Sequence, residues 1–349
     1  MEYFSVIKIF ILTTLAFIIT ILWTPALTHF LYKYRLGKKI RDEDSAPIFS
    51  KMHKNKSGTP TMGGILIWGT TLVLALLFFY LSIYTDVEFF KRLNFLTRSQ
   101  TLLPLGALVA SALVGLVDDW LNVKRIGPKG GGFRMRHRLL IYTGIAIIAA
   151  WWFYFKLDWD VIRVPFLGIY NIGWWAIPLF IFIIVATSFS VNETDGLDGL
   201  AGGTLLACFV AFGAIAFTQG KYDLTAFCGV IIGSLLAFLW FNINPARFFM
   251  GDTGAMSLGV TLGIITIYTH SILLLPIIGF IFVLESLSVI IQVFSRKIRK
   301  KKVFLSAPLH HHFEAIGWSE PKIVMRAWII AGVTAVVGLI ISLIDKGLT

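Results

Sequence analysis

Three groups of acidic residues stand out because each lies at the edge of a long apolar run. They are Asp118-Asp119, the segment 192–198 with Asp195 and Asp198, and Gly251-Asp252-Thr253-Gly254. A carboxylate at the edge of a membrane is costly unless it pairs with a cation or a metal ion. If the apolar runs cross a membrane, all three groups lie on one side of it. This placement favours a metal-dependent active site at the cytoplasmic surface of the bilayer.

The composition indicates that the apolar runs are membrane spans. The chain has 349 residues, of which 57% are hydrophobic and only 14% are charged, whereas soluble domains carry about 25% charged residues. The runs are roughly 20 residues long and do not alternate, which is typical of transmembrane helices and not of barrel strands. We therefore predict an all-α polytopic membrane protein, with residues 1–349 forming a single integral-membrane domain.

Ten apolar ranges are long enough to be transmembrane helices: 9–31, 62–84, 101–121, 139–156, 173–190, 200–218, 224–242, 254–272, 273–294 and 325–344. With the N-terminus outside, the inside loops hold 23 of the 31 Lys and Arg residues. Because cytoplasmic loops are enriched in Lys and Arg, we predict that both termini lie outside. The net charge of +12 then reflects this bias and attraction to anionic lipid, so we expect no nucleic-acid partner.

Asp118 and Asp119 close the third range, where the partial negative charge of a helix C-terminus disfavours acids. Lys124, Arg125, Lys129 or a bound Mg²⁺ could compensate this charge, and a solvated helix end is the alternative. Asp252, just before the eighth range, could hold Mg²⁺ through oxygen beside a helix N-terminus that also favours phosphate. A simple N-cap is the alternative for Asp252.

Asn192, Asp195 and Asp198 are spaced i, i+3, i+6, so they share one face if the segment is helical. The alternative is that Asp195 caps the next helix. Lys56 begins the segment Lys56–Gly64, whose Gly and Thr residues, including Thr59, supply backbone and hydroxyl donors. It is not a P-loop, because the lysine precedes the glycines. A plain loop with proline near the first helical turn is the alternative.

Successive residues of a helix point about 100° apart, so His310, His311 and His312 cannot all face one site. We expect one or two of them to contact phosphate while another packs. A zinc site is the weaker alternative, since no Cys or matching His spacing supports it. Glu285 lies inside the ninth range and is either a functional group or, if that helix is kinked, a structural hydrogen-bond partner. The two cysteines, Cys208 and Cys228, lie inside apolar runs, and we expect them to be small core residues.

These motifs together resemble the phospho-N-acetylmuramoyl-pentapeptide transferase family. The resemblance covers nearly the whole chain and rests on Lys56–Gly64, Val117-Asp118-Asp119, Asn192–Gly199, Trp240-Phe241-Asn242 with Phe249–Gly254, and Pro308–Glu314. The Thr-Pro-Thr-Met-Gly-Gly and triple-histidine segments distinguish this family from relatives that transfer N-acetylglucosamine 1-phosphate to the same lipid.

The resemblance implies a Mg²⁺-dependent reaction of UDP-MurNAc-pentapeptide with undecaprenyl phosphate in the bacterial inner membrane, which yields lipid I and UMP. It implies that Asp252 binds Mg²⁺, that Asp118 is base or nucleophile with Asp119 beside it, and that His311 contacts the sugar-phosphate. It also implies a homodimer. The residues expected to bind substrate are Lys56, Thr59, Asn192, Asp195, Asp198, Asn242, Phe249, His310 and His312.

Two departures from the family pattern lie near these motifs: Glu193 replaces an apolar residue, and Asn122 stands where a lysine is common. We therefore assign no catalytic lysine to the loop after Asp119, which is also rich in glycine. Two rival functions are a polyprenyl-phosphate GlcNAc-1-phosphate transferase and, more remotely, a transporter with an acid relay. A transporter would place polar residues in the middle of its spans, whereas only Glu285 is deep here.

Overall fold

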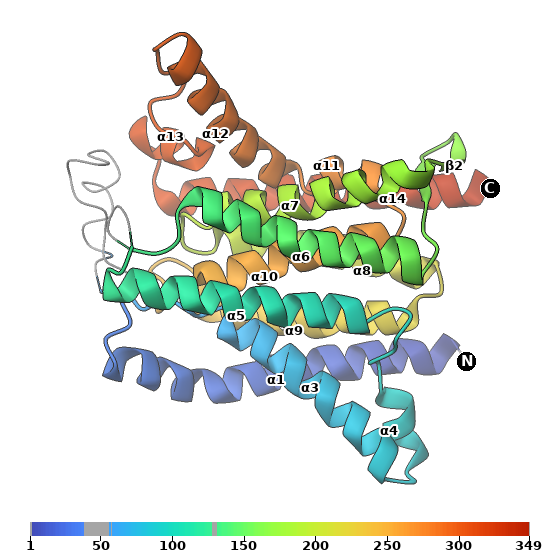
Figure 1. Cartoon of the computed structure of the whole chain (residues 1–349). Helices are drawn as coiled ribbons and strands as arrows, with labels where there is room; N and C mark the ends of the chain where they lie inside the picture. The colour runs from blue at the N-terminus through green and yellow to red at the C-terminus, as the bar shows by residue number, and fades with distance from the viewer. Residues whose placement is uncertain (1, 38–55, 57, 128–130, 349) are drawn as a thin grey trace.

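The computed structural model describes residues 2–37, 56, 58–127 and 131–348. Helices dominate this part of the chain, as predicted (Figure 1). The long helices are α1 (Glu2–Lys33), α3 (Ile65–Tyr84), α5 (Leu102–Lys124), α6 (Met135–Lys156), α7 (Ala176–Thr194), α8 (Leu200–Thr218), α9 (Tyr222–Asn242), α10 (Gly251–Tyr268), α12 (Phe280–Ile298) and α14 (Glu320–Leu348). The short ones are α4 (Glu88–Leu93), η3 (Gly173–Trp175), η4 (Ile272–Leu274), α11 (Leu275–Ile278) and α13 (Leu309–Ala315).

Each of the ten predicted ranges contains a helix, but not all of these helices have the composition of a membrane span. Within the described residues, eight helices are long and apolar enough to cross a membrane, and the bent pair of α11 and α12 raises the number to nine. The helix left out is α10, which packs between α5 and α7. Every residue of α10 except Asp252 is buried. Because protein surrounds it, α10 tolerates glycine and hydroxyl side chains that a lipid-facing helix would not favour.

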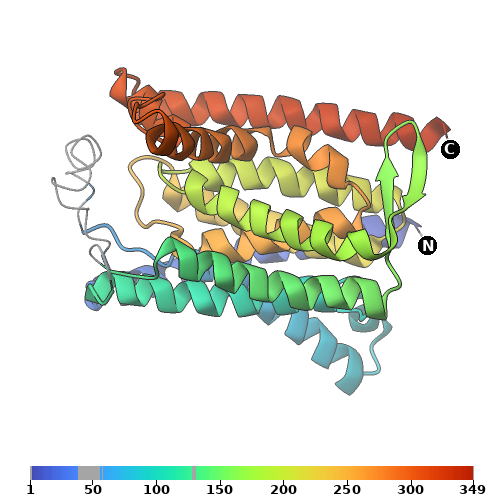
Figure 2. The ribbon, with the colours of Figure 1, turned by 45° about the horizontal axis from the view of Figure 1, so that its top comes forward.

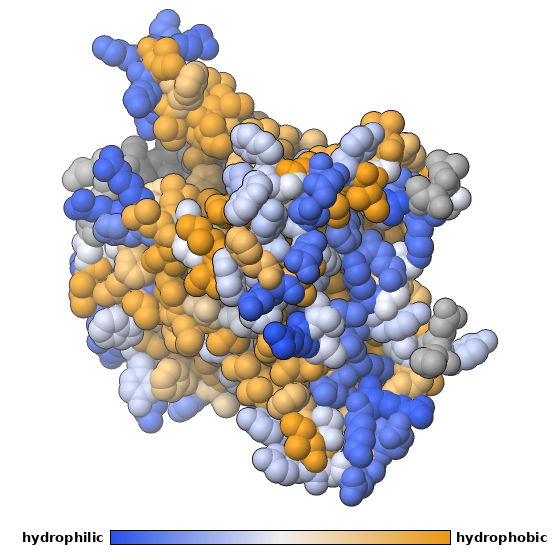
Figure 3. Space-filling view, turned by 45° about the vertical axis from the view of Figure 1, so that its right-hand side comes forward, coloured by the Kyte–Doolittle hydropathy of each residue, from blue (hydrophilic) through white to orange (hydrophobic). Residues whose placement is uncertain are grey.

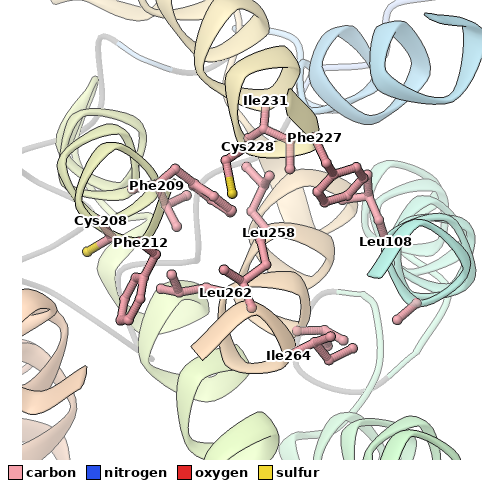
Figure 4. Close-up of a cluster of buried hydrophobic side chains, with 14 of the residues drawn as sticks. Leu108, Cys208, Phe209, Phe212, Phe227, Cys228, Ile231, Leu258, Leu262 and Ile264 are labelled. Atoms are coloured by element: carbon pink, nitrogen blue, oxygen red, sulfur yellow. The ribbon is translucent and has the colours of Figure 1, made fainter. Parts of the chain in front are cut away.

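In the interior of the bundle α8 packs against α9, and α10 lies beside α8. Phe209, Cys228 and Leu258 meet there, as Figure 4 shows, and all three side chains are fully buried. Cys208 and Cys228 are free thiols in this interior, which confirms the prediction that they are core residues. Between membrane helices such van der Waals packing supplies much of the cohesion, because lipid tails are as apolar as the side chains.

The ninth predicted range is not one straight helix. The chain bends by 85° between Ile272–Ile278 and Phe280–Ile298, at Gly279, and α12 then projects away from the bundle (Figure 1). The eighth and ninth ranges are nearly continuous in the sequence, and the predicted turn between them is at His270-Ser271 and Pro276. The turn at His270-Ser271 is confirmed, since α10 ends at Tyr268 and η4 starts at Ile272. Pro276 lies inside α11, at its first turn, so it starts this short helix and does not mark the turn. The bend places Glu285 beside the histidine segment.

A β-hairpin that we did not predict joins α6 to α7. Strands β1 (Val161–Val164) and β2 (Gly168–Asn171) pair in antiparallel register, with Val161 opposite Asn171. Four residues per strand give too short an alternation to be recognised from sequence. The hairpin lies at the end of the bundle where the first and last described residues also lie (Figures 1 and 2). The acidic motifs lie at the opposite end.

Candidate active site

The acidic motifs gather at one end of the bundle because α5 and α7 end there while α10 begins there. Arg138, in the first turns of α6, holds them together. Its Nη2 atom lies 2.7 Å from the Asp118 carboxylate and 2.9 Å from the Asp252 carboxylate. Its Nη1 atom donates to Asn192 Oδ1 at 3.1 Å. Two carboxylates from different helices therefore share one guanidinium group.

Arg138 is a site residue that the sequence analysis missed. We expected Lys124, Arg125 or Lys129 to compensate the acids, but Lys129 lies outside the described residues. Neither Lys124 nor Arg125 makes an ion pair in the part of the chain that the structure describes. The sequence did contain an indication of this role. Arg138 lies in the first turn of α6, where a cation is unfavourable beside the positive end of the helix dipole. Such a cation implies a nearby negative partner.

Asp118 and Asp252 differ in their access to solvent. The Asp118 side chain is 0% exposed, and it accepts a hydrogen bond of 2.5 Å from the backbone N–H of Phe133. The Asp252 side chain is 12% exposed and accepts a 2.6 Å hydrogen bond from Asn192 Nδ2. Asn122, one of the two departures, reaches Asp252 only at 3.5 Å. Of the two carboxylates, Asp252 is the one that a ligand can approach from outside.

Asp119 faces the start of α10, and its partners are mostly backbone groups. It accepts hydrogen bonds from the N–H groups of Asp252 at 3.1 Å and Thr253 at 3.0 Å, and from Thr61 Oγ1 at 3.1 Å. The first N–H groups of a helix have no partner within the helix, and negative charge is favourable there. Asp119 thus fixes the N-terminus of α10 and, with it, the position of Asp252. These contacts are those of a positioning residue.

Gly251 makes this close approach possible. Its φ is +74°, and a Cβ atom there would lie 2.5 Å from Asp119 Oδ2 and 2.6 Å from Thr61 Oγ1. Asp252 is the second residue of α10, after Met250 as the N-cap. The alternative that Asp252 is itself an N-cap is therefore wrong. Its side chain is directed instead to Arg138 and Asn192.

The donor set fits Mg²⁺ better than zinc. Mg²⁺ is usually held by one or two carboxylates together with substrate phosphates and water, and Asp118 and Asp252 provide two carboxylates around one cation position. A closed zinc site needs four ligands, mostly Cys or His. Among the described residues, no three His, Cys, Asp or Glu side chains lie close enough together to hold a metal ion. The histidine zinc site is therefore not supported.

A second group of charges surrounds Lys56. Lys56 Nζ lies 2.7 Å from Asp198 and 2.5 Å from Glu320. Asn244 Nδ2 donates to both carboxylates, at 3.0 Å each. Glu320, the first residue of α14, was not predicted; a helix N-terminus favours an acid, but nothing in its spacing indicated a partner. Residue 57 of this motif lies outside the described part of the chain.

The remaining residues predicted for substrate binding line this second group. Asn242 links two loops, since it accepts from Gly199 N at 2.9 Å and donates to the Phe248 carbonyl at 2.8 Å. The half-buried ring of Phe249 has Lys56 Nζ 5.9 Å from its centroid. Thr59 is half-buried in the turn that follows Lys56.

The expected helical face of Asn192, Asp195 and Asp198 is wrong, because α7 ends at Thr194 and Asp195 is its C-cap. The N-cap of α8 is Gly199, so Asp195 does not cap the next helix either. Asp198 lies in the connecting loop. The last turn of α7 therefore presents Asn192 to the carboxylate pair, while the loop that follows presents Asp198 to Lys56. The substituted Glu193 lies in the last turn of α7 and is half-buried.

Three histidines point in three directions, as predicted. His310 is fully buried, and its Nδ1 atom lies 2.9 Å from Glu285 Oε2, which also accepts from the His310 N–H at 3.2 Å. Its Nε2 atom faces Gly196, where an added Cβ would lie 2.2 Å away. Glu285 therefore positions His310, which supports the structural alternative for this acid.

His311 and His312 have different surroundings. His311 Nδ1 lies 2.7 Å from Glu314 Oε2, and 12% of the His311 side chain is exposed. His312 Nδ1 accepts from the Leu305 N–H at 3.3 Å, and its ring contacts Phe304. His312 thus anchors the loop before α13, while His311 stays partly exposed beside Glu314.

Comparison with known proteins identifies two matching family descriptions. The model of Glycosyl transferase family 4 matches residues 101–270, and a phospho-N-acetylmuramoyl-pentapeptide-transferase signature matches residues 56–67. A phospho-N-acetylmuramoyl-pentapeptide-transferase of Chloroflexus aggregans is 40% identical over 347 residues, covering 96% of this chain and 89% of the relative. One of Listeria welshimeri is 39% identical over 324 residues, with 92% and 94% covered. One of a Geobacillus species is 38% identical over 334 residues, with 94% and 96% covered.

Proposed function

Because the chain belongs to the phospho-N-acetylmuramoyl-pentapeptide-transferase family, we propose that it joins UDP-MurNAc-pentapeptide to undecaprenyl phosphate. The products are lipid I and UMP, and the step serves peptidoglycan synthesis. The observation that carries this assignment is the carboxylate pair Asp118 and Asp252 around Arg138, at the end of a membrane bundle. A lipid phosphate at the membrane edge can reach this end, and so can a nucleotide sugar from the water.

The proposed reaction is a displacement at phosphorus. An oxygen of the lipid phosphate bonds to the phosphorus that carries the sugar, and the bond from that phosphorus to UMP breaks, with UMP leaving on the bridging oxygen. Asp118, buried beside Arg138, accepts a proton from the lipid phosphate, or attacks first and forms a covalent intermediate. In both routes the chain must stabilise the charge that develops on the phosphoryl oxygens, which is the main source of catalysis in phosphoryl transfer.

Mg²⁺ is proposed as the cofactor, held by Asp252 with Asp118 close by. When bound, it neutralises charge on the pyrophosphate and orients it. The support is the donor set: two carboxylates on rigid helix ends, one of them accessible, with Asn192 fixing the Asp252 carboxylate at 2.6 Å. Arg138 supplies a fixed cation beside the same carboxylates and can bind a phosphate oxygen. Asp119 keeps α10, and so Asp252, in place.

The remaining residues are proposed to bind the nucleotide sugar. Lys56, Asp198 and Phe249 form one wall, on which charge and an aromatic face lie side by side. His311, held by Glu314, is the histidine that contacts the sugar-phosphate. His310 and His312 are proposed to hold the histidine segment in position, through Glu285 and the Leu305 N–H respectively.

The site is proposed to lie on the cytoplasmic face of the bacterial inner membrane. The division of Lys and Arg among the loops supports this orientation, and the described termini lie together at the opposite end of the bundle (Figures 1 and 2). A homodimer is proposed on the family resemblance alone.

One assay separates the proposal from both rivals. Purified protein is given undecaprenyl phosphate, Mg²⁺ and either radiolabelled UDP-MurNAc-pentapeptide or radiolabelled UDP-GlcNAc. We expect label in the lipid fraction, with release of UMP, from the first donor only. Labelled lipid from UDP-GlcNAc alone would assign the chain to the related transferases. No labelled lipid from either donor, with folded protein, would reject a transferase.

A further inference from the structure

A cavity of about 250 Å³, lined by charged and polar as well as apolar residues, lies at the end of the bundle opposite the carboxylate pair. It is lined by the β-hairpin, the C-terminal ends of α8 and α14, and the turn that follows α10. Figure 3 shows hydrophilic side chains gathered on this end of the molecule, between apolar surfaces. No step of the proposed reaction uses this cavity.

The cavity has more positive than negative charge. Its described lining contains Arg163, Lys221 and Lys346, against one carboxylate, Asp345. Asp345 is already engaged, since it pairs with Arg163 Nε at 2.5 Å and accepts from the Phe166 N–H at 2.8 Å. These contacts clamp the hairpin to α14. Lys346 Nζ donates to the Thr218 carbonyl. With Arg163 paired to Asp345, Lys221 is the cation of this lining whose contacts bear most on ligand binding.

The contacts of Lys221 indicate that its ammonium group can bind a ligand in the cavity. Its Nζ donates to Gln219 Oε1 at 2.9 Å and to the Tyr268 carbonyl at 2.5 Å. Among the described residues, no carboxylate lies within ion-pair distance of it. An ammonium group has three donors. Two of them are used by these oxygens, and the Trp159 ring lies 5.5 Å from Nζ, so the third donor has no oxygen partner among the described residues and can turn to a ligand. Burial lowers the pKa of Lys221 to about 8, as expected for a cation without a counter-ion.

His270 faces the same cations. Its ring stacks on Trp159 with centroids 4.3 Å apart. Burial, followed by the charges of Lys221 and Arg163, lowers the pKa of His270 to about 4. The imidazole is therefore neutral at pH 7. A neutral imidazole keeps one N–H donor, which an anion in this positive potential can accept.

We propose that this cavity binds the phosphate group of an anionic phospholipid, with Lys221 and Lys346 as its cationic contacts. Pockets for drug-sized ligands are roughly 300–1,000 Å³, so this cavity has room for a head-group fragment and not for a nucleotide. Apolar side chains of α14 lie exposed beside it, including Leu343 at 43% and Ile344 at 51%. They can support the acyl chains, which a soluble phosphate lacks.

The test measures thermal unfolding of the full chain in a neutral detergent. Short-chain phosphatidylglycerol, short-chain phosphatidylcholine and inorganic phosphate are titrated separately. We expect saturable stabilisation by phosphatidylglycerol, with half-saturation at a far lower concentration than for the other two. Lys221→Gln should weaken the apparent phosphatidylglycerol affinity about tenfold, the value of one charge-assisted hydrogen bond. Lys221→Arg should largely restore it.

Lys156→Gln is the matched control, because Lys156 is an exposed lysine at the C-terminus of α6, at the same end but outside the cavity. We expect it to bind like the wild type. If Lys221→Gln does not fold, Lys346→Gln tests the same contact, and we expect a similar loss. If folded Lys221→Gln and Lys346→Gln bind phosphatidylglycerol as the wild type does, the proposal that this cavity is the binding site is wrong. Equal stabilisation by inorganic phosphate would overturn a lipid as the source of the phosphate group.

Discussion

Asp118 and Asp252 approach one guanidinium group from two helices, and their different surroundings suggest different tasks. The fully buried Asp118 is held by Arg138 and a backbone N–H. The partly exposed Asp252 is held by Arg138 and Asn192. Burial suits a group that exchanges a proton with the lipid phosphate, while exposure suits a metal ligand. This difference can be tested by replacing each carboxylate with its amide.

Asp118→Asn should lower kcat by about 10²–10⁴ while KM for UDP-MurNAc-pentapeptide changes little, because a general base acts mainly in the transition state. Initial rates over a range of donor concentrations measure both quantities. Asp86→Asn is the control, since the Asp86 side chain is fully exposed. Normal kcat with a raised KM would make Asp118 a binding residue.

Asp252→Asn should abolish the Mg²⁺ response of the enzyme. For the wild type we expect chelation to stop turnover and added Mg²⁺ to restore it. For the variant we expect turnover at least 10²-fold lower, with a shifted Mg²⁺ titration, because the amide is a poorer ligand for a hard cation. Near-normal activity with the wild-type Mg²⁺ titration would remove Asp252 from the metal site.

Asp119→Asn should act mainly on stability. The amide removes the negative charge and one of the two acceptors at the start of α10, which should cost about 1–2 kcal/mol of unfolding free energy. Thermal unfolding in detergent measures this loss relative to wild type. A variant of unchanged stability but without turnover would show that Asp119 takes part in the reaction itself and is not only a positioning residue.

At the scale of elements, the sequence was sufficient to locate the helices but not their mutual contacts. The ten ranges were visible because lipid requires long apolar runs. The 85° bend at Gly279 was not visible, since both of its arms are apolar. Arg138 and Glu320 were missed for a related reason. Their partners lie far away in the chain, and no local spacing reports a contact between different helices.

The C-terminal end of α7 and the loop that leads to α8 together connect the parts of the site. Asn192 reaches the carboxylate pair, Asp198 reaches Lys56, and Gly196 lies against His310. Position 196 requires a glycine because a Cβ atom there would collide with His310 Nε2. No pattern in the neighbouring sequence indicates this requirement. A side chain there would displace the imidazole from Glu285.

Gly196→Ala should therefore lower kcat/KM by at least tenfold, because a shifted His310 disturbs the wall expected to hold the sugar-phosphate. Gly144→Ala is the matched control, since no atom lies within 4 Å of a Cβ at that position in α6. We expect Gly144→Ala to keep full activity and to gain a few tenths of a kcal/mol in stability or more. Equal activity of both variants would show that His310 does not depend on Gly196.

At the scale of the whole molecule, the end of the bundle that holds the carboxylate pair must be the end that faces the nucleotide sugar. The loops at the carboxylate end carry most of the Lys and Arg, and the described termini lie together at the other end (Figure 1). The central helix α10 is sheltered from lipid on all sides. It can therefore present a carboxylate at its N-terminus without exposing polar groups to the bilayer.

The most direct test uses sealed bacterial membrane vesicles of both orientations, prepared from cells that express this chain after their own transferase has been depleted. Labelled UDP-MurNAc-pentapeptide, which does not cross the bilayer, is added outside. We expect labelled lipid from inverted vesicles with the wild type, none from right-side-out vesicles, and none from either with Asp252→Asn. Labelled lipid from intact right-side-out vesicles, or undiminished product with Asp252→Asn, would contradict a cytoplasmic site built around this carboxylate.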